Sequence, residues 1–274
     1  AGNRSVLDFW SDHMNIPYDL SLIDVGEPFK PCPGELSAQA GSCALKCIEK
    51  AHDAAEKYKL PLVTLPVSKH AIEITHPGFT GHTEYLAEIE GKNPKNDIIM
   101  MLGGEKLKVI TLTRHIPISH VTKELSVDMI VSQIEITHRW FLKWKKRKAL
   151  FWIAGCNPHA GESGTIGSEE IDTIIPAVKK LRSKGVTIEG PFAGDTMFVN
   201  AVKKNVDISV SCYHDQGLGP LKMIHFDDGV NVTIGLDIVR TSVGHGTAFD
   251  IAGKRVADTG SFETAIKWAE SLSE

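Results

Sequence analysis

Residues 150–167 read LFWIAGCNPHAGESGTIG, and this stretch decides the fold class. Its first five residues are apolar and mostly aromatic or branched, which predicts a buried strand at Leu150–Ala154. Three glycines between Asn157 and Gly167 then allow the backbone to approach a ligand closely. Ser168 with two glutamates behind it is typical of a helix start. A strand, a glycine-rich turn and a helix in this order indicate an α/β protein.

The same alternation extends in both directions from this stretch. Short apolar runs predict strands at Leu20–Asp24, Leu62–Leu65, Ile98–Leu102, Lys108–Leu112, Ile208–Tyr213, Val230–Ile234 and Leu236–Val239. Longer patterns with a helical period predict helices at Ser5–Met14, Ser37–Lys57, Val121–Trp144, Ser168–Lys184 and Phe262–Ser273. Strands and helices that alternate in this way favour mainly parallel sheets. Neither an internal repeat nor a low-complexity linker interrupts the pattern.

Composition argues against several classes of protein. The chain has 274 residues, 42% of them hydrophobic, and a formal charge of −4, so nothing favours a nucleic-acid partner. The basic run at residues 143–148 is interpreted as a solvated helix end, with a phosphate-binding patch as the alternative. No apolar run reaches the roughly 18 residues of a membrane span, and we recognise no signal peptide, so a cytoplasmic location is expected. Five cysteines, an odd number without a compact framework, argue against a disulfide scaffold.

Three of the twelve histidines, His115, His159 and His214, follow predicted strands. Because ligands of open α/β sheets bind beyond the carboxyl ends of strands, these imidazoles can converge on one metal ion. The alternative is three unrelated loop histidines, since residues so far apart in sequence carry no spacing signature. Lys222 follows His214 closely and either shuttles protons or binds phosphate near such a metal, or is an ordinary surface lysine.

Two further polar groups accompany predicted strands and turns. His82 and Thr83 follow a glycine-flanked turn, and helix capping explains the threonine but not the histidine. Asn231 and Arg240 flank the predicted strands between residues 230 and 239. Arginine is the side chain best suited to bidentate contacts with phosphate or carboxylate.

The segment 244–253 is rich in glycine and contains Asp250, which can accept hydrogen bonds from ribose hydroxyls. Its glycines allow the backbone to come close to a ligand. However, no G-x-G-x-x-G motif follows a predicted strand anywhere in the chain. The sequence pattern by itself therefore does not support a Rossmann dinucleotide site.

Together these segments resemble the 4-hydroxythreonine-4-phosphate dehydrogenase family of pyridoxal phosphate biosynthesis, across nearly the whole chain. The motifs that carry the resemblance are Pro77-Gly78, Gly81-His82-Thr83-Glu84, Asn157-Pro158-His159-Ala160-Gly161-Glu162, Gly190-Pro191, Asp195-Thr196, Tyr213-His214-Asp215-Gln216-Gly217, Gly229-Val230-Asn231 and Arg240-Thr241-Ser242. The resemblance implies an isopropylmalate-dehydrogenase-like fold of two α/β/α domains with a cleft between them. Residues 1–75 and 225–274 would form the discontinuous cofactor-side domain, and residues 76–224 the domain of the metal ligands and the dimer interface.

The resemblance also implies roles for individual residues. The ligands of one divalent metal (zinc, manganese, cobalt, nickel or magnesium) would be His115, His159 and His214. The substrate contacts would be His82, Thr83, Lys222, Asn231 and Arg240, and the catalytic residues Lys222 and Asp195. NAD or NADP would be bound by His245, Gly246, Thr247, Ala248 and Asp250. The implied assembly is a homodimer whose active site borrows a residue from the partner.

The implied reaction is oxidation of 4-hydroxythreonine 4-phosphate, or of a related four-carbon phosphorylated hydroxy acid, followed by decarboxylation of the β-keto acid. Some relatives act instead on threonate or erythronate 4-phosphate, and others on cis-dihydrodiols of aromatic dicarboxylates. Lys222, Asn231 and Arg240 favour a phosphate ester, because three donors suit a dianion. A catalytically silent phosphate-binding protein is one alternative. A metal-dependent hydrolase is another, although no further carboxylate stands beside His115 or His159 to act as its base.

Three departures from the family pattern matter for this interpretation. The family begins with a strand and a Gly-Asp-Pro-Ala-Gly type loop that are not present here, so an N-terminal piece is expected to be missing. Asp228 stands where the family commonly has arginine, and Gly244 where it commonly has aspartate. Both changes lie beside the implied phosphate and cofactor regions, and they motivate the alternative of a silent binding protein.

Overall fold

A computed structural model describes residues 1–273 and divides them into two compact units. Unit 1 comprises Ala1–Gly91 and Asp237–Ser273, and unit 2 comprises Lys92–Leu236. The boundaries between the units lie after residues 91 and 236, later in the chain than the expected domain boundaries after residues 75 and 224. The two expected domains therefore stay a prediction. The first boundary lies later because the α4 region is fastened to α2 in unit 1, where Tyr85 Oη donates to Glu49 Oε1 at 2.6 Å.

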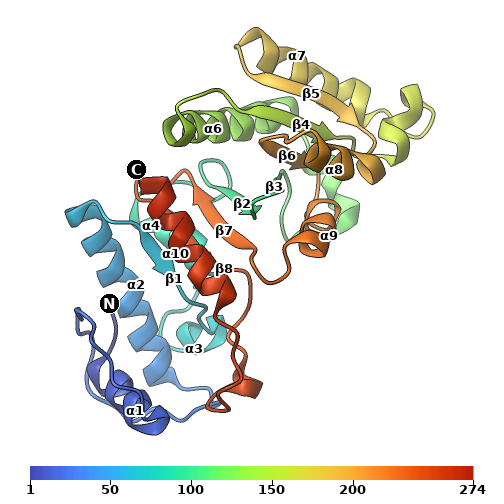
Figure 1. Ribbon diagram of the computed structural model, residues 1–274. Coiled ribbons are helices and arrows are strands. Elements are labelled where there is room, and N and C mark those ends of the chain that lie inside the picture. The colour runs from blue at the N-terminus through green and yellow to red at the C-terminus, as the bar shows by residue number, and fades with distance from the viewer. Residues whose placement is uncertain (274) are drawn as a thin grey trace. The chain divides into compact units, whose positions relative to one another are not determined.

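Unit 1 is organised around two parallel strands, β1 and β8, in which Val63 is the register partner of Thr241. The helices α2 and α10 flank this strand pair (Figure 1). Ser37 begins α2 by accepting a hydrogen bond from Ala40 N, as an N-cap serine does. The elements of unit 1 are α1 (Arg4–Met14), α2 (Ala38–Tyr58), β1 (Leu62–Thr64), α3 (Lys69–Glu73), α4 (His82–Ile89), β8 (Arg240–Val243), η4 (Phe249–Ile251) and α10 (Gly260–Ser273).

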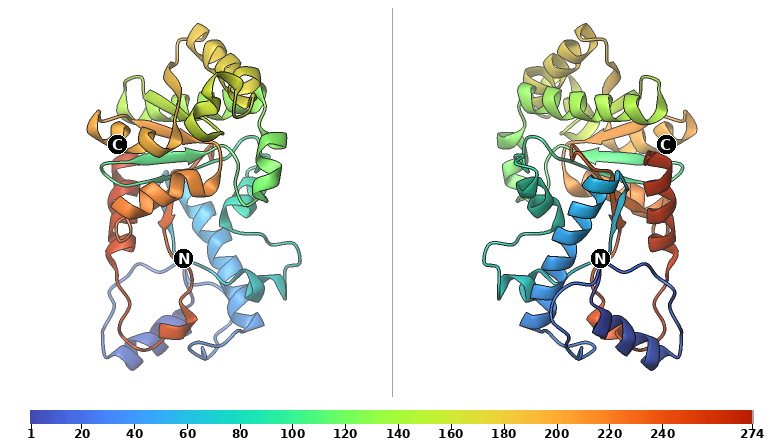
Figure 2. Two further views of the ribbon diagram at one scale, coloured as in Figure 1. Left: turned by 90° about the vertical axis from the view of Figure 1, so that its right-hand side faces the viewer. Right: turned by 90° about the vertical axis from the view of Figure 1, so that its left-hand side faces the viewer.

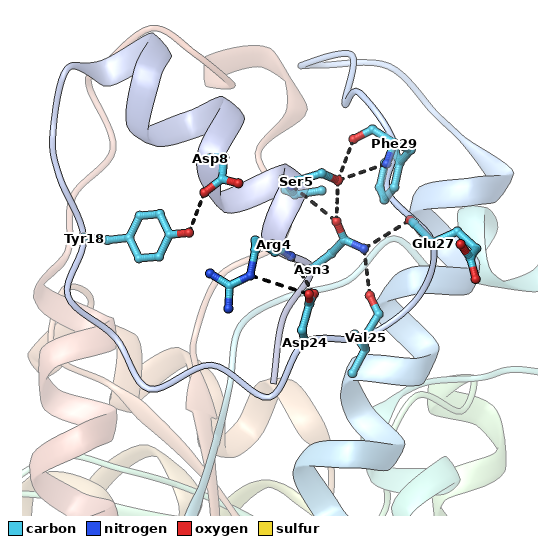
Figure 3. Close-up of polar contacts among 10 residues, drawn as sticks. Asn3, Arg4, Ser5, Asp8, Tyr18, Asp24, Val25, Glu27 and Phe29 are labelled. Atoms are coloured by element: carbon cyan, nitrogen blue, oxygen red, sulfur yellow. Dashed lines mark hydrogen bonds and ion pairs between the residues drawn. The ribbon is translucent and has the colours of Figure 1, made fainter.

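Asn3 fastens the start of unit 1 (Figure 3). Its Oδ1 caps α1 by accepting from Val6 N at 3.3 Å, and its Nδ2 donates to the Val25 carbonyl at 2.7 Å. The strand predicted at Leu20–Asp24 is wrong, because only an isolated bridge between Gly2 and Asp24 forms there. That segment has no neighbouring strand to cover its apolar side chains, and Leu20 is 65% exposed.

Unit 2 contains a sheet with the strand order β7-β2-β3-β6-β4-β5 within residues 92–236. The expectation of mainly parallel pairing is confirmed, except that β2 runs antiparallel to both β3 and β7. Its strands are β2 (Ile99–Gly103), β3 (Lys108–Thr111), β4 (Leu150–Ala154), β5 (Thr187–Phe192), β6 (Ile208–Ser211) and β7 (Val230–Ile234). Its helical segments are η1 (Ile118–His120), α5 (Val121–Glu124), α6 (Val127–Lys145), η2 (Pro158–Gly164), η3 (Glu170–Ile174), α7 (Ile175–Ser183), α8 (Gly194–Lys203) and α9 (His214–Ile224).

The two faces of the unit 2 sheet are covered by different helices. Successive residues of a strand point to opposite faces, and β4 shows this directly. Phe151 contacts His138 of α6, whereas Trp152 belongs to a buried cluster with Met197 and Phe198 of α8. The mixed α/β fold predicted from the sequence is thereby confirmed. No helix within residues 1–273 combines the length and the apolar composition needed to cross a membrane.

Two further predicted elements differ from the structure. The helix predicted at Val121–Trp144 breaks at Leu125, whose backbone is extended, because Ser126 caps a new helix by accepting from Met129 N at 3.3 Å. The strand predicted at Leu236–Val239 is also wrong. The strand in this part of the chain is β8, and it begins only at Arg240, after a turn at Gly235, which has a positive φ of 107°.

The helix α9 escaped prediction because it contains two glycines and a proline. At Gly217 a Cβ would lie 2.5 Å from Ser211 Oγ and 2.6 Å from Val109 Cγ1, whereas at Gly219 a Cβ would meet nothing within 4 Å. We therefore expect Gly217→Ala to destabilise the protein by about 1–3 kcal/mol. In the same helix, Gly219→Ala should leave stability unchanged or raise it by up to about 1 kcal/mol. Urea unfolding of both variants checks this pair, and equal effects would contradict the packing described here.

Candidate active site

Two of the three histidines predicted to bind metal lie together in unit 2. The strands β3 and β6 are parallel neighbours, with Thr111 opposite Ser211, so their carboxyl ends lie side by side. His115 follows β3 and His214 begins α9 directly after β6, and their ring centroids are 5.4 Å apart. The fold thus brings together two imidazoles that are 99 positions apart in sequence (214 minus 115).

A carboxylate orients one of these rings. His214 Nδ1 lies 2.7 Å from Asp215 Oδ1, so Nδ1 donates to the carboxylate and Nε2 is the nitrogen left to face another ligand. A carboxylate on one nitrogen and a metal on the other is the usual environment of a metal-binding histidine. The donor chemistry at His115 and His214 therefore fits a divalent metal. Sequence reasoning assigned no role to Asp215, although it lies within the motif that carries the resemblance.

His159 is exposed and lies in η2, which follows β4. Within residues 1–273, no three histidine, cysteine, aspartate or glutamate side chains form a group that would hold a metal ion. The structure therefore brings His115 and His214 together without showing His159 beside them. The three-histidine site stays a prediction.

Three other predicted site residues belong to unit 2. Lys222 is exposed in the last turn of α9, and Asp195 is exposed in the first turn of α8. Asn231 lies in β7, where its Oδ1 is buried and finds no hydrogen-bond partner among the described residues. A buried acceptor without a donor is energetically unfavourable, so this oxygen is suited to a donor on a bound ligand.

Unit 1 contains a buried cation. Arg240 is 3% exposed at the start of β8, and its guanidinium donates to Thr64 Oγ1 at 2.7 Å and to Thr83 Oγ1 at 3.2 Å. Burial lowers the pKa of Arg240 to about 10, and the nearby Glu84 carboxylate partly opposes this. Arg240 is thus charged at neutral pH and held in place by two hydroxyls, which suits it to bind an anion. Thr64 was missed in the sequence because its contact with Arg240 depends on the pairing of β1 with β8.

Acid should destabilise unit 1 through His82. Burial, followed by the positive charges of Arg240 and Lys69, lowers the pKa of His82 to about 3, far below the ordinary value of about 6.5. Below pH 6.5 the unfolded chain takes up a proton that the folded chain resists, so stability falls as the pH falls. We expect this residue to contribute a loss of about 1 kcal/mol per pH unit between pH 6 and pH 4. His82→Gln should remove that part of the slope in urea unfolding, and an unchanged slope would contradict the cause given.

The residues predicted to bind NAD lie on one exposed segment of unit 1. His245, Gly246, Thr247, Ala248 and Asp250 are all exposed. At Gly244, one of the departures from the family, the backbone N–H donates to Ser261 Oγ at 3.1 Å. Just after this segment, Arg255 Nη2 donates to the carbonyl of His13 in α1 at 2.7 Å. Figure 2 shows the dark blue α1 beside the orange-red η4 in both views.

Asp228, the other departure, has a local partner. Its carboxylate lies 3.0 Å from Nδ1 of His225, a side chain that is 5% exposed. The second ring nitrogen of His225 accepts from Lys106 N at 3.2 Å, so Nδ1 is the protonated nitrogen. Asp228 therefore helps to tie the end of α9 to the turn between β2 and β3.

Comparison with known proteins gives consistent results. The model of a family described as "Pyridoxal phosphate biosynthetic protein PdxA" matches residues 6–269. A 4-hydroxythreonine-4-phosphate dehydrogenase of Desulforapulum autotrophicum is 43% identical over 241 residues, which cover 87% of this chain and 68% of that protein. A D-threonate 4-phosphate dehydrogenase of Cupriavidus necator is 40% identical over 257 residues, which cover 93% of this chain and 75% of that protein.

Solved structures agree with these relatives. The 4-hydroxythreonine-4-phosphate dehydrogenase of Klebsiella pneumoniae is 39% identical, with a TM-score of 0.83 over 92% of this chain and 76% of that one. A terephthalate 1,2-cis-dihydrodiol dehydrogenase of Burkholderia xenovorans is 27% identical, with a TM-score of 0.70 over 98% of this chain and 88% of that one. Fold and relatives together define an oxidoreductase of the dehydrogenase class. The chain belongs to the PdxA family of pyridoxal phosphate biosynthetic proteins, which confirms the resemblance found in its sequence.

Proposed function

We propose that this chain is a metal-dependent, NAD(P)-linked dehydrogenase. Its substrate would be 4-hydroxythreonine 4-phosphate or a closely related four-carbon phosphorylated hydroxy acid, and decarboxylation of the β-keto acid would follow. The observation that carries the proposal is the pair His115 and His214 at adjacent strand ends, with Asp215 on the second nitrogen of His214. Relatives named as dehydrogenases of 4-hydroxythreonine 4-phosphate and of D-threonate 4-phosphate support the substrate class.

His115, His159 and His214 would hold the metal, and the adjacency of the His115 and His214 rings supports this. When bound there, a divalent metal lowers the pKa of a substrate hydroxyl and polarises a carbonyl. Lys222 would accept the hydroxyl proton, and Asp195 would act as a polar support. Asn231 Oδ1 would accept a hydrogen bond from the substrate, which satisfies an acceptor that the described residues leave without a donor.

The anionic end of the substrate would be bound by Arg240, Thr83 and His82. Arg240 provides charge and a rigid fork of donors, while the lowered pKa of His82 keeps its ring neutral at physiological pH. A neutral imidazole donates one hydrogen bond without adding a second buried cation. NAD or NADP, which accepts the hydride, would bind at the segment that contains His245, Gly246, Thr247, Ala248 and Asp250.

The test is NADH or NADPH formation at 340 nm by purified protein with added divalent metal. The substrates are 4-hydroxythreonine 4-phosphate, threonate and erythronate 4-phosphates, and an aromatic cis-dihydrodiol, each with and without a chelator. Chelator-sensitive oxidation of one phosphate ester supports the proposal and identifies the substrate. Silence on all compounds, with metal demonstrably bound, would instead favour a phosphate-binding protein without turnover.

Two further parts of the proposal concern the setting of the enzyme. We propose a homodimer in the cytoplasm, with an active site completed by a residue of the partner. Light scattering of the purified protein at assay concentration tests the first part. If activity depends on the partner, specific activity should fall on dilution in parallel with the fraction of dimer.

A further inference from the structure

We infer that Glu170 is a positioning residue that fixes the turn at residues 157–163 and thereby aims His159. The inference rests on the proposed function, in which His159 is a metal ligand. It adds a residue that has no role in the sequence-based assignment, where Glu170 was only one of the two acids at a helix start.

The turn that contains His159 has an unusual backbone. Five consecutive residues, 159–163, have positive φ values of 52°, 52°, 76°, 42° and 58°. Only one of them, Gly161, is a glycine, and a left-handed conformation is sterically unfavourable for the other four. Such a conformation persists only where the surrounding structure holds it.

The carboxylate of Glu170 stabilises this backbone conformation. Glu170 is buried, with only 2% of its surface exposed. Oε1 accepts from the Asn157 backbone N–H at 2.8 Å, and Oε2 accepts from Asn157 Nδ2 at 3.0 Å. Glu169 Oε2 accepts a further bond from the same Nδ2 at 2.7 Å. Asn157, two residues before His159, is therefore fixed through both its backbone and its side chain.

The glycines of this stretch make room for the same contacts. At Gly161 a Cβ would lie 2.4 Å from Glu170 Oε2, and at Gly155 it would lie 3.0 Å from Glu170 Oε1. At Gly167 it would lie 2.6 Å from Asn157 Nδ2. The sequence indicated that glycines here admit a ligand close to the backbone. In the structure, what comes closest to Gly161 is the Glu170 carboxylate, whereas at Gly155 Ala160 lies nearer than that carboxylate, with its Cα 2.7 Å from a Cβ placed there.

These contacts fix the backbone from which the exposed His159 side chain extends. The direction of the His159 Cα–Cβ bond follows from its own φ and ψ of 52° and 27° and from the placement of Asn157. A carboxylate accepts both Asn157 hydrogen bonds without conflict, because it carries no donor. A glutamine at position 170 has the same shape but turns an N–H₂ group toward one of the two donors. That substitution therefore disturbs the turn while it preserves the packing.

The test is the affinity of purified wild-type protein and Glu170→Gln for cobalt(II), measured by titration of its visible absorption. We expect the variant to bind cobalt about 10-fold more weakly or worse, with a changed ligand-field spectrum, as is typical when support for a metal ligand is lost. Glu169→Gln, which affects one hydrogen bond, should have a smaller effect. Asn157→Ala should weaken binding as well and serves as the second variant if Glu170→Gln does not fold.

Thr137→Val is the matched control for a purely structural effect. Thr137 is fully buried in α6 of the same unit and donates to Gln133 O at 2.8 Å, so its loss lowers stability without touching the turn. Cobalt affinity of this variant should equal that of the wild type. If Glu170→Gln or Asn157→Ala binds cobalt(II) as tightly as the wild type, the role inferred for Glu170 is wrong. That outcome leaves the proposed metal site unaffected. A wild-type protein that binds no divalent metal would overturn the proposed metal site, and this inference with it.

Discussion

Replacing Arg240 by methionine is expected to lower kcat/KM for the phosphorylated substrate by about 1000-fold. Truncation of one partner in a buried, charged hydrogen-bonded contact removes about 2–5 kcal/mol, and each 1.4 kcal/mol corresponds to about a factor of ten. The upper part of that range applies because Thr64 and Thr83 hold the guanidinium in place before any ligand arrives. Steady-state kinetics with the ester identified in the substrate panel measures the effect.

The stability of the same variant should not fall, which separates a binding role from a structural one. Burial lowers the pKa of Arg240, so the folded protein disfavours the charge that this side chain carries at pH 7. An apolar side chain of similar length removes that unfavourable term, and this gain offsets the loss of the hydrogen bonds to Thr64 and Thr83. Urea unfolding checks this directly. A variant that is inactive only because it has unfolded would contradict the argument.

Two control variants sharpen the test. Arg240→Lys keeps the charge but loses the planar fork, so an intermediate loss of kcat/KM is expected. Arg182→Met removes a surface arginine that donates to the Ile188 carbonyl in unit 2, and it should leave the kinetics unchanged. If Arg240→Met retains wild-type kcat/KM, Arg240 does not belong to the substrate site.

Local sequence pattern was sufficient for much of the fold. The strands at Leu150–Ala154 and Val230–Ile234 match the structure residue for residue, because almost every side chain in them is buried. Pattern failed where tertiary contacts override propensity. The glycines and proline of α9 argue against a helix, yet Gly217 is what allows that helix to lie against β3. At Leu20–Asp24 an apolar run had no strand beside it to complete a sheet.

The residues of the candidate site could be predicted from the sequence, but the side chains that hold them in place could not. His115 and His214 were identified because they follow strands, and the parallel pairing of β3 with β6 brings them together. The contact of Thr64 with Arg240 spans 176 positions, and no local sequence pattern predicts it. Glu170 was visible only as an acid near a helix start, since its bonds to Asn157 exist only once the turn has folded back.

Replacing His214 by alanine is expected to abolish stoichiometric metal binding. The substitution removes one imidazole of the proposed three, together with the nitrogen that Asp215 orients. Loss of a supporting partner alone weakens metal binding by about 10- to 100-fold, so loss of a direct ligand should exceed that range. Activity should then fall below about one thousandth of the wild-type value, because the hydroxyl is no longer activated.

The structure predicts little loss of stability in the His214→Ala variant, because 36% of the side chain is exposed and its ring packs against His115 rather than in the core. Metal content after gel filtration and cobalt(II) titration measure the binding defect, and urea unfolding measures stability. His120→Gln is the matched control, since His120 is an exposed histidine of the same unit, five positions after His115 (120 minus 115). Undiminished cobalt binding in His214→Ala would exclude this histidine as a ligand. Equal losses in both variants would point to unspecific binding by surface imidazoles, because only His214 lies against a second histidine and a carboxylate.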